Sequence, residues 1–242
     1  MSIFRTKRFK FCIVHLACSF IFACIALGLM FGFWYPNSLS VATGVTYLFL
    51  MMLAIDVIVG PVLGFIVYKE GKKGLKIDLA IIILIQLLAL IYGLYSIEKG
   101  RPAYIVYNTD RFELVRKNEI VRNDHQYNEN FGAYPSYVAV QYPSARKLKE
   151  KVMFDEVFGG VSLSQRPEFY QALESAKQQM EDKVLSLNDL SKYNPPLQVD
   201  KIVSKYPSAI GFFPLRANNL DMTLLVDKEY KVIKIVDLRP WN

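Results

Sequence analysis

The sequence predicts a membrane protein in which three transmembrane α-helices are followed by an extracytoplasmic α+β domain. Hydrophobic residues make up 52% of the chain, but the long apolar runs lie almost entirely before Ser96. Lys and Arg cluster beside some of these runs and are absent beside others. After Lys99, short strand-like runs and amphipathic segments replace the long apolar ones, which is typical of a mixed globular domain.

Three apolar runs are long enough to cross a bilayer, which takes about 20 residues. Residues 11–33 contain no Asp, Glu, Lys or Arg, and residues 40–68 contain one charge, Asp56. Residues 79–97 contain none. The first run is longer than the apolar core of a signal peptide, so we expect it to stay in the mature protein. The predicted organisation is helices at about 11–33, 40–68 and 77–97, a transmembrane region over 1–98 and an extracytoplasmic domain over 99–242.

The flanks of the apolar runs predict their orientation. Four basic residues precede the first run and four lie between the second and third, whereas the loop between the first and second has none. Because Lys and Arg mark the cytoplasmic side, the amino terminus is predicted to lie inside and the domain after the third run outside. Trp34, Tyr47 and Tyr92 would then fall near the outer interface, where aromatic side chains are enriched.

The formal net charge of +7 does not indicate nucleic-acid binding. Eight of the 29 basic residues are the topology markers just described, and the other 21 are accompanied by 19 acidic residues from Glu98 onward. A surface that binds phosphates needs denser clustering of basic side chains than this. We therefore expect no nucleic-acid partner.

Strands are predicted in the first half of the extracytoplasmic domain. Short β-branched and aromatic runs occupy 103–107, 111–120 and 136–142, and the polar loop 122–135 lies before the last of them. A helix is predicted over 144–158, with Leu148 and Val152 facing inward.

A second helix is predicted over 166–187, where Pro167 suits a first helical turn. The Pro-rich segment 193–198 is interpreted as a bend. The domain is predicted to end in a hairpin that turns at 227–230. The apolar stripe of the second helix consists of Phe169, Leu173, Ala176, Met180 and Val184.

No arrangement of residues predicts catalysis, a cofactor or a metal. The single histidine of the domain, His125, lies in a polar loop, and no known nucleophile, zinc or phosphate-loop motif occurs. Cys12, Cys18 and Cys24 are spaced by six within the first run, so they point in different directions on a helix and are interpreted as small apolar side chains. Asp78 is interpreted as a residue at the start of the third helix, too far in depth from Asp56 for an aspartyl pair.

The most informative stretch is the second run, which places a carboxylate and a helix breaker inside the membrane. An ionisable group near mid-membrane costs roughly 2.5–3.5 kcal/mol by insertion scales, so Asp56 is expected to face other helices or a cavity. Gln86 is expected at similar depth, where it could bond to the Asp56 carboxyl. Pro61 would remove a backbone donor from the second helix, and Gly60 and Gly64 would thin one face of it, so that another backbone could approach.

These four residues leave three interpretations open. The helices could form a packed hairpin with one internal hydrogen bond. They could form a groove for a foreign transmembrane helix, shaped by Asp56, Gly60, Pro61 and Gln86. Passage of an ion or solute is the third, although three spans are few for a transporter.

Several short motifs follow one another between Leu50 and Val115: "DVIVGP" at 56–61, "KEGKKGLKIDLAII" at 69–82, "IQLLALIYGLY" at 85–95, "RPAYIVY" at 101–107 and "DRFELV" at 110–115. In order and spacing they resemble the type IV pilin accessory proteins of the TfpX/TfpZ (FimB-like) family. The sequence departs from the family pattern at Gly64, where a threonine is common, so no polar role is carried over to that position.

The resemblance implies a non-enzymatic, chaperone-like protein of the bacterial inner membrane with a periplasmic domain. It implies that the protein assists the stability, assembly or surface display of a major type IV pilin, without cofactors and among membrane lipids. We expect the four residues Asp56, Gly60, Pro61 and Gln86 to shape a groove for the pilin's transmembrane helix and the periplasmic domain to contact the pilin's head. Homo-oligomerisation is left open. The alternative is a small channel or transporter, or an oligomeric envelope protein unrelated to pili.

Overall fold

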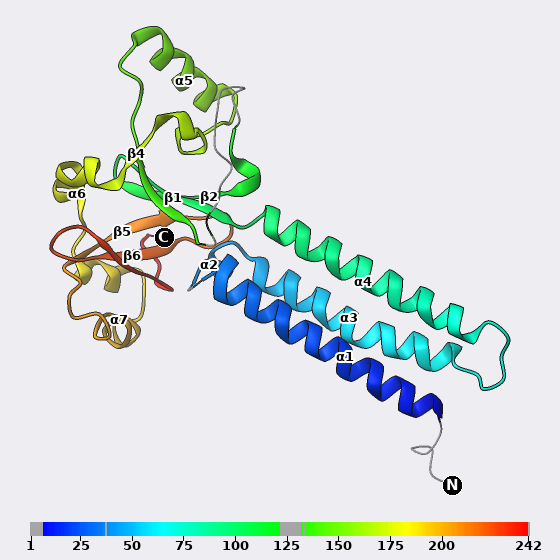
Figure 1. The fold of residues 1–242 in the computed structure, drawn as a ribbon. Coiled ribbons are helices and arrows are strands. Elements are labelled where there is room, and N and C mark those ends of the chain that lie inside the picture. Colours follow the sequence, from blue (N-terminus) through cyan, green and yellow to red (C-terminus); the bar gives the residue numbers. More distant parts are fainter. Residues whose placement is uncertain (1–6, 37, 122–131, 133, 242) are drawn as a thin grey trace. The chain divides into compact units, whose positions relative to one another are not determined.

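The computed structural model describes residues 7–36, 38–121, 132 and 134–241 (Figure 1). The chain divides into two compact units. The first comprises Met1–Phe33 and Val45–Lys99, and the second comprises Trp34–Gly44 and Gly100–Asn242.

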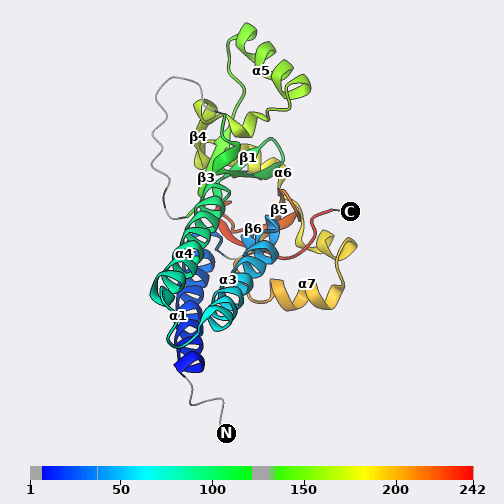
Figure 2. The same ribbon diagram turned by 90° about the vertical axis from the view of Figure 1, so that its right-hand side faces the viewer.

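The first unit consists of three long apolar helices that run alongside one another (Figures 1 and 2). They are α1 (Lys7–Leu29), α3 (Val45–Val67) and α4 (Leu75–Lys99), and both α1 and α4 pack against α3. Within the described ranges these helices are long and apolar enough to cross a membrane, α1 being extended by a π-helical turn over Met30–Trp34. The predicted class, three apolar helices followed by an α+β domain, is confirmed.

The prediction of one continuous helix over 40–68 is wrong, because the segment forms two helices. The short helix α2 (Leu39–Ala42) ends before Gly44, and α3 begins at Val45. Gly44 has a φ of +73°, a left-handed conformation that glycine adopts at little cost. This turn separates α2 from the apolar helix that follows it.

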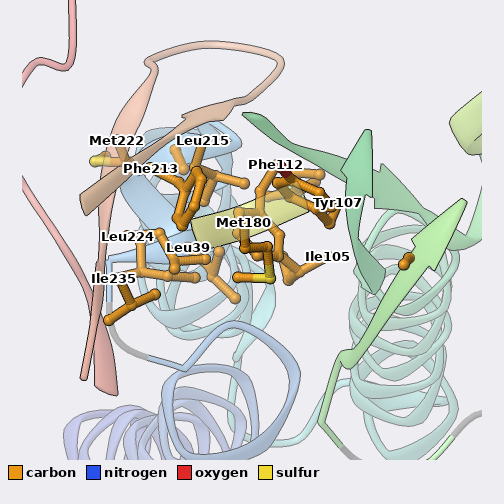
Figure 3. Close-up of a cluster of buried hydrophobic side chains, with 14 of the residues drawn as sticks. Leu39, Ile105, Tyr107, Phe112, Met180, Phe213, Leu215, Met222, Leu224 and Ile235 are labelled. Atoms are coloured by element: carbon orange, nitrogen blue, oxygen red, sulfur yellow. The ribbon is translucent and has the colours of Figure 1, made fainter. Parts of the chain in front are cut away.

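The short α2 segment packs into the second unit. Leu39 is 1% exposed and Ala42 is fully buried in the main core of that unit (Figure 3). The Ala42 carbonyl accepts hydrogen bonds from the backbone N–H groups of Asn219 and Leu220, at 3.0 and 3.1 Å. From the sequence, residues 39–42 were predicted to belong to the transmembrane region. So short a segment carries no local pattern that would reveal its packing into the second unit.

The connection between α3 and α4 is polar. Asp78 lies in the first turn of α4, as expected for a residue at a helix start. Its carboxylate forms an ion pair with Lys72 at 2.6 Å. A negative charge in a first turn is favourable, because it faces the positive end of the helix dipole.

The second unit is built on one mixed sheet. Within the described residues the strand order is β4-β3-β1-β2-β5-β6-β7. The β1–β3 and β2–β5 pairs are parallel, and the other neighbours are antiparallel. The strands are β1 (Pro102–Asn108), β2 (Arg111–Arg116), β3 (Ser136–Val140), β4 (Tyr170–Ala172), β5 (Gly211–Arg216), β6 (Met222–Val226) and β7 (Val232–Val236).

The first three strands were predicted, with one difference in length. The predicted strand 111–120 ends at Arg116, because Lys117–Glu119 forms a 3₁₀ turn. In that turn the Glu119 side chain accepts a hydrogen bond from the backbone N–H of Arg116 at 2.9 Å. The strand therefore ends at Arg116, where the Glu119 side chain accepts the backbone hydrogen bond.

The main core of the second unit lies on one face of this sheet (Figure 3). Tyr107, Phe112 and Phe213 pack with ring centroids 5.2–5.7 Å apart, two of the three pairs edge to face. Ring pairs at such distances stabilise a core beyond the area that they bury. Met180 of α6 (Lys177–Lys183) covers these rings.

The predicted hairpin at the end of the chain is confirmed. β6 and β7 pair antiparallel, and the Tyr230 N–H donates to the Asp227 carbonyl at 2.9 Å. Asp227 Oδ1 accepts from the backbone N–H groups of Glu229 and Lys231. Tyr230 itself has a φ of +62°. The aspartate thus stabilises the turn as such residues commonly do.

The helix predicted over 166–187 is wrong. The segment forms a 3₁₀ turn, the edge strand β4, a second 3₁₀ turn and only then α6. Hydrogen bonds between β4 and β3 outweigh the local preference for helix. The predicted stripe is nevertheless buried or partly buried, at Phe169, Leu173, Ala176, Met180 and Val184.

Two further elements differ from the predictions. The predicted bend over 193–198 contains the start of α7 (Pro196–Val203), whose first position is a proline, as helices accept. Strand β5 was not predicted. Residues 122–131, including His125 and most of the predicted polar loop, lie outside the described residues.

The predicted helix over 144–158 is α5 (Arg146–Phe158). Val152 is fully buried as predicted, whereas Leu148 is 43% exposed, contrary to the prediction. The Arg166 guanidinium pairs with Asp155 at 2.8 Å, and the Tyr142 hydroxyl donates to Glu156 at 2.5 Å. The second bond is the main reason why the pKa of Tyr142 rises to about 12.

Candidate functional site

A polar cluster lies at mid-length of the three apolar helices. Asp56 is the twelfth of the 23 residues of α3, and Gln86 is the twelfth of the 25 residues of α4. Gln86 Nε2 donates to Ser19 Oγ at 3.0 Å and to the backbone carbonyl of Asp56 at 2.6 Å. Gln86 Oε1 lies 2.9 Å from His15 Nε2. One side chain of α4 therefore bonds to both α1 and α3.

Small residues of α3 make room for these contacts. A Cβ added at Gly60 would overlap Gln86 Oε1. One turn further on, a Cβ at Gly64 would lie 2.7 Å from Phe11 Cε1 of α1. Pro61 is buried, and α3 continues through it as a helix. The thin face predicted for this helix is thus where α1 and the Gln86 side chain approach it.

A cavity of about 270 Å³ adjoins the polar cluster, and we call it the membrane groove. Most of its lining is apolar, and its volume suits a few side chains of a neighbouring helix. Of the four predicted site residues, Asp56 and Gln86 line it, whereas Gly60 and Pro61 are buried residues of α3 that are not part of the lining. The lining residues are Phe11, Val14, His15, Cys18, Ser19, Phe22, Ala23, Leu53, Asp56, Val57, Ile83, Gln86, Leu87 and Leu90.

The contact between Asp56 and Gln86 differs from the predicted one. Gln86 reaches the Asp56 backbone carbonyl and not its carboxyl, because Gly60 leaves the α3 backbone open to the amide. Asp56 Oδ2 is buried without a hydrogen-bond partner within the ranges that the structure describes. The compensation expected for this carboxyl is therefore not supplied by Gln86.

Sequence reasoning missed two members of the cluster, His15 and Ser19. Both are 9% exposed and lie on α1, one helical turn apart. Their spacing of four residues places them on the same helix face. Two polar residues at that spacing inside an otherwise apolar span were the sequence signal that could have identified them.

The three cysteines of α1 form no cluster. Cys12 is half-buried, and Cys18 and Cys24 are exposed on the helix. Cys18 also lines the membrane groove. The described part of the chain contains no group of three or more His, Cys, Asp or Glu residues that could hold a metal ion.

The second unit has a polar cleft of about 350 Å³ beside β2. Its carboxylates are engaged within the unit: Glu113 accepts from Ser162 Oγ at 3.1 Å, and Glu119 accepts from Asn218 at 2.9 Å. Glu119 also pairs with Arg116 at 2.6 Å. Because these groups stabilise the fold around the cleft, the membrane groove is the stronger candidate site.

The chain resembles curated proteins of Dichelobacter nodosus. It is 30% identical over 240 residues to the fimbrial assembly protein of serogroup E1 and 29% identical over 241 residues to that of serogroup I, with 93% of each chain covered in both cases. It is 36% identical over 113 residues to the fimbrial assembly protein of serogroups C1 and C2, which covers 46% of this chain and 86% of that protein. No family profile and no solved structure matches the chain significantly.

Proposed function

Because the chain belongs to the family of fimbrial assembly proteins, with a role in pilus biogenesis, we propose that it binds the major type IV pilin and assists its stability, assembly or surface display. In this proposal the protein acts by binding, as a chaperone-like accessory factor, and not by catalysis. The observation that carries the proposal is the membrane groove beside Asp56, whose buried Oδ2 has no hydrogen-bond partner within the described residues.

The membrane groove supports the docking of a pilin's transmembrane helix. Three helices present a mostly apolar hollow at mid-span, and Gly60 leaves room on α3 for the Gln86 side chain that lines it. Helix association in a bilayer depends on close packing and on interhelical hydrogen bonds, because lipid gives no hydrophobic driving force. The groove offers both kinds of interaction to an incoming helix.

The outward side of α5 supports a contact with the pilin's globular head. Met153, Phe154, Val157 and Phe158 are 46–73% exposed, and the two phenylalanine rings lie 4.6 Å apart. Large apolar side chains grouped on a surface commonly mark a protein-binding site. Aromatic residues are also frequent hot spots of such interfaces.

The proposed location is the inner membrane of a bacterium, with the amino terminus in the cytoplasm and the second unit in the periplasm. The distribution of Lys and Arg beside the apolar helices supports it. Alkaline phosphatase fused after the last residue should be active in cells. An inactive fusion that is as abundant as an active control would contradict this topology.

Co-purification tests the proposed pilin binding. The full chain, purified in mild detergent from piliated cells, should retain the pilin. Asp56→Ala should lower the retained pilin and surface piliation several-fold at equal protein level. The matched control is Thr46→Val, which removes a buried, unpartnered hydroxyl of α3 outside the membrane groove and should change neither.

Unchanged pilin retention and piliation in Asp56→Ala would eliminate the role of the groove. A stable homo-oligomer that purifies without pilin would favour the alternative of a channel. Both outcomes are read from the same preparation, by immunoblotting and size-exclusion chromatography.

A further inference from the structure

Two buried side-chain atoms of the polar cluster have no hydrogen-bond partner within the described residues. Gln86 Nε2 uses its two hydrogens on Ser19 Oγ and the Asp56 carbonyl. Gln86 Oε1 can only accept, so the hydrogen of this contact comes from His15 Nε2. The two atoms are His15 Nδ1 and Asp56 Oδ2.

Both residues line the membrane groove, but the Asp56 carboxyl is the group that an incoming donor can reach more easily. His15 is 9% exposed, and its Nδ1 lies beside α3, 3.6 Å from where a Cβ of Gly64 would be. The Asp56 side chain is only half-buried, and the cavity provides room next to it. A buried carboxyl without a partner is unfavourable, and more so where lipid replaces water.

The remaining lining of the groove defines what kind of molecule could bring the missing donor. Phe, Leu, Val and Ile side chains make up most of it. Such a surface suits an apolar helix better than a string of waters or an ion, each of which needs several polar partners. An apolar helix that carries one hydrogen-bond donor matches both the apolar lining and the Asp56 carboxyl.

We propose that the membrane groove selects a transmembrane helix that carries a hydrogen-bond donor, a carboxamide or an ammonium group, at mid-span opposite Asp56. This inference rests on the proposed docking of a helix in the groove. It adds the chemical requirement that the docked helix must meet. A purely apolar helix of the same length binds more weakly, because it leaves the Asp56 carboxyl without a partner.

The test uses the full chain in lipid nanodiscs and leucine–alanine transmembrane peptides of about 20 residues whose central residue is Leu, Gln or Lys. Binding is measured by fluorescence energy transfer between labelled peptide and protein. We expect the Gln peptide to bind roughly tenfold more tightly than the Leu peptide, the factor typical of one interhelical hydrogen bond. The Lys peptide is expected to gain at least as much.

Three variants make the measurement specific. Asp56→Leu should remove the preference for the Gln peptide over the Leu peptide. Asp56→Asn, which keeps a carbonyl acceptor, should retain the preference for Gln and lose the additional gain for Lys. Thr46→Val serves again as the control outside the groove and should bind all peptides like the parent chain.

Equal affinity for the three peptides, including affinities that are all too weak to measure, would overturn the inference. A preference for Gln that survives in Asp56→Leu would also overturn it. Either result leaves the proposed function separately testable, because pilin retention by the full chain is measured without these peptides.

Discussion

Gln86 uses both ends of its amide to connect the three apolar helices. Its nitrogen bonds to Ser19 of α1 and to the α3 backbone, and its oxygen bonds to His15. Each interhelical hydrogen bond in a membrane contributes about 0.6–2 kcal/mol. Gly60 is what allows the amide to reach the α3 backbone.

Gly60→Ala is therefore expected to destabilise the three-helix unit by about 1–3 kcal/mol, the loss of one or two such bonds. The added methyl would displace the Gln86 amide. The matched control is Gly28→Ala in α1, where an added methyl would have no other atom within 4 Å. Thermal unfolding in detergent should separate the two variants, and equal midpoints would show that the Gln86 network does not hold the helices together.

At this scale the sequence predicted part of the site. Asp56 and Gln86 could be predicted to lie at similar depth in the membrane, because each lies in an apolar span whose orientation the basic residues predict. The bonded atoms could not be predicted, since the choice between the Asp56 carboxyl and its carbonyl depends on how closely α4 approaches Gly60. His15 required the packing of α1, which no local pattern specifies.

Helix α5 shows how an element is held by few contacts. Val152 is its fully buried side chain. Its last turns bond to the rest of the unit through Asp155, which pairs with Arg166, and through Glu156, which accepts from the Tyr142 hydroxyl and the Leu163 N–H. The Arg166 side chain is 10% exposed. Removing one partner of a buried pair is costly, because the other charge is left uncompensated.

Arg166→Met should loosen α5 by about 1–3 kcal/mol. Amide hydrogen exchange in 146–158 should accelerate by one to two orders of magnitude, while β6 and β7 remain protected. Arg146→Met is the control, because the Arg146–Glu150 pair is on the surface and Arg146 is 91% exposed. If both variants exchange alike, the Arg166–Asp155 pair does not anchor the helix.

Elements were predictable where the local pattern and the tertiary structure agree. The hairpin of β6 and β7 combines two apolar strands with an aspartate turn, and both signals are local. The segment 166–187 carries a helical stripe, yet β4 forms there because β3 offers an edge to pair with. Such pairing depends on residues about 30 positions away in the chain, which the stripe cannot reveal.

At the scale of the whole molecule, the second unit incorporates a segment from the other end of the chain. Leu39 and Ala42 are buried in its main core, although residues 45–99 separate them from the rest of the unit. The apolar helices set the overall class, which the sequence predicted. This long-range packing was not predictable, because α2 has only four residues.

Leu39→Ala should destabilise the second unit by about 2–5 kcal/mol, as for other buried leucines. Val41→Ala is the matched control, because Val41 lies in the same short helix and is 39% exposed. Protection of the β5 and β6 amides from hydrogen exchange reports on both variants. Similar protection in the two would mean that the segment contributes little to this core.

The central claim is that a pilin helix docks in the membrane groove, and in-cell photocrosslinking tests it most directly. A benzophenone residue at Val14, which lines the groove and is 55% exposed, should crosslink to the major pilin. The same residue at Ile58, which is 58% exposed on α3 but outside the groove, should not. Pilin adducts of equal yield at both positions, or at neither, would contradict the claim.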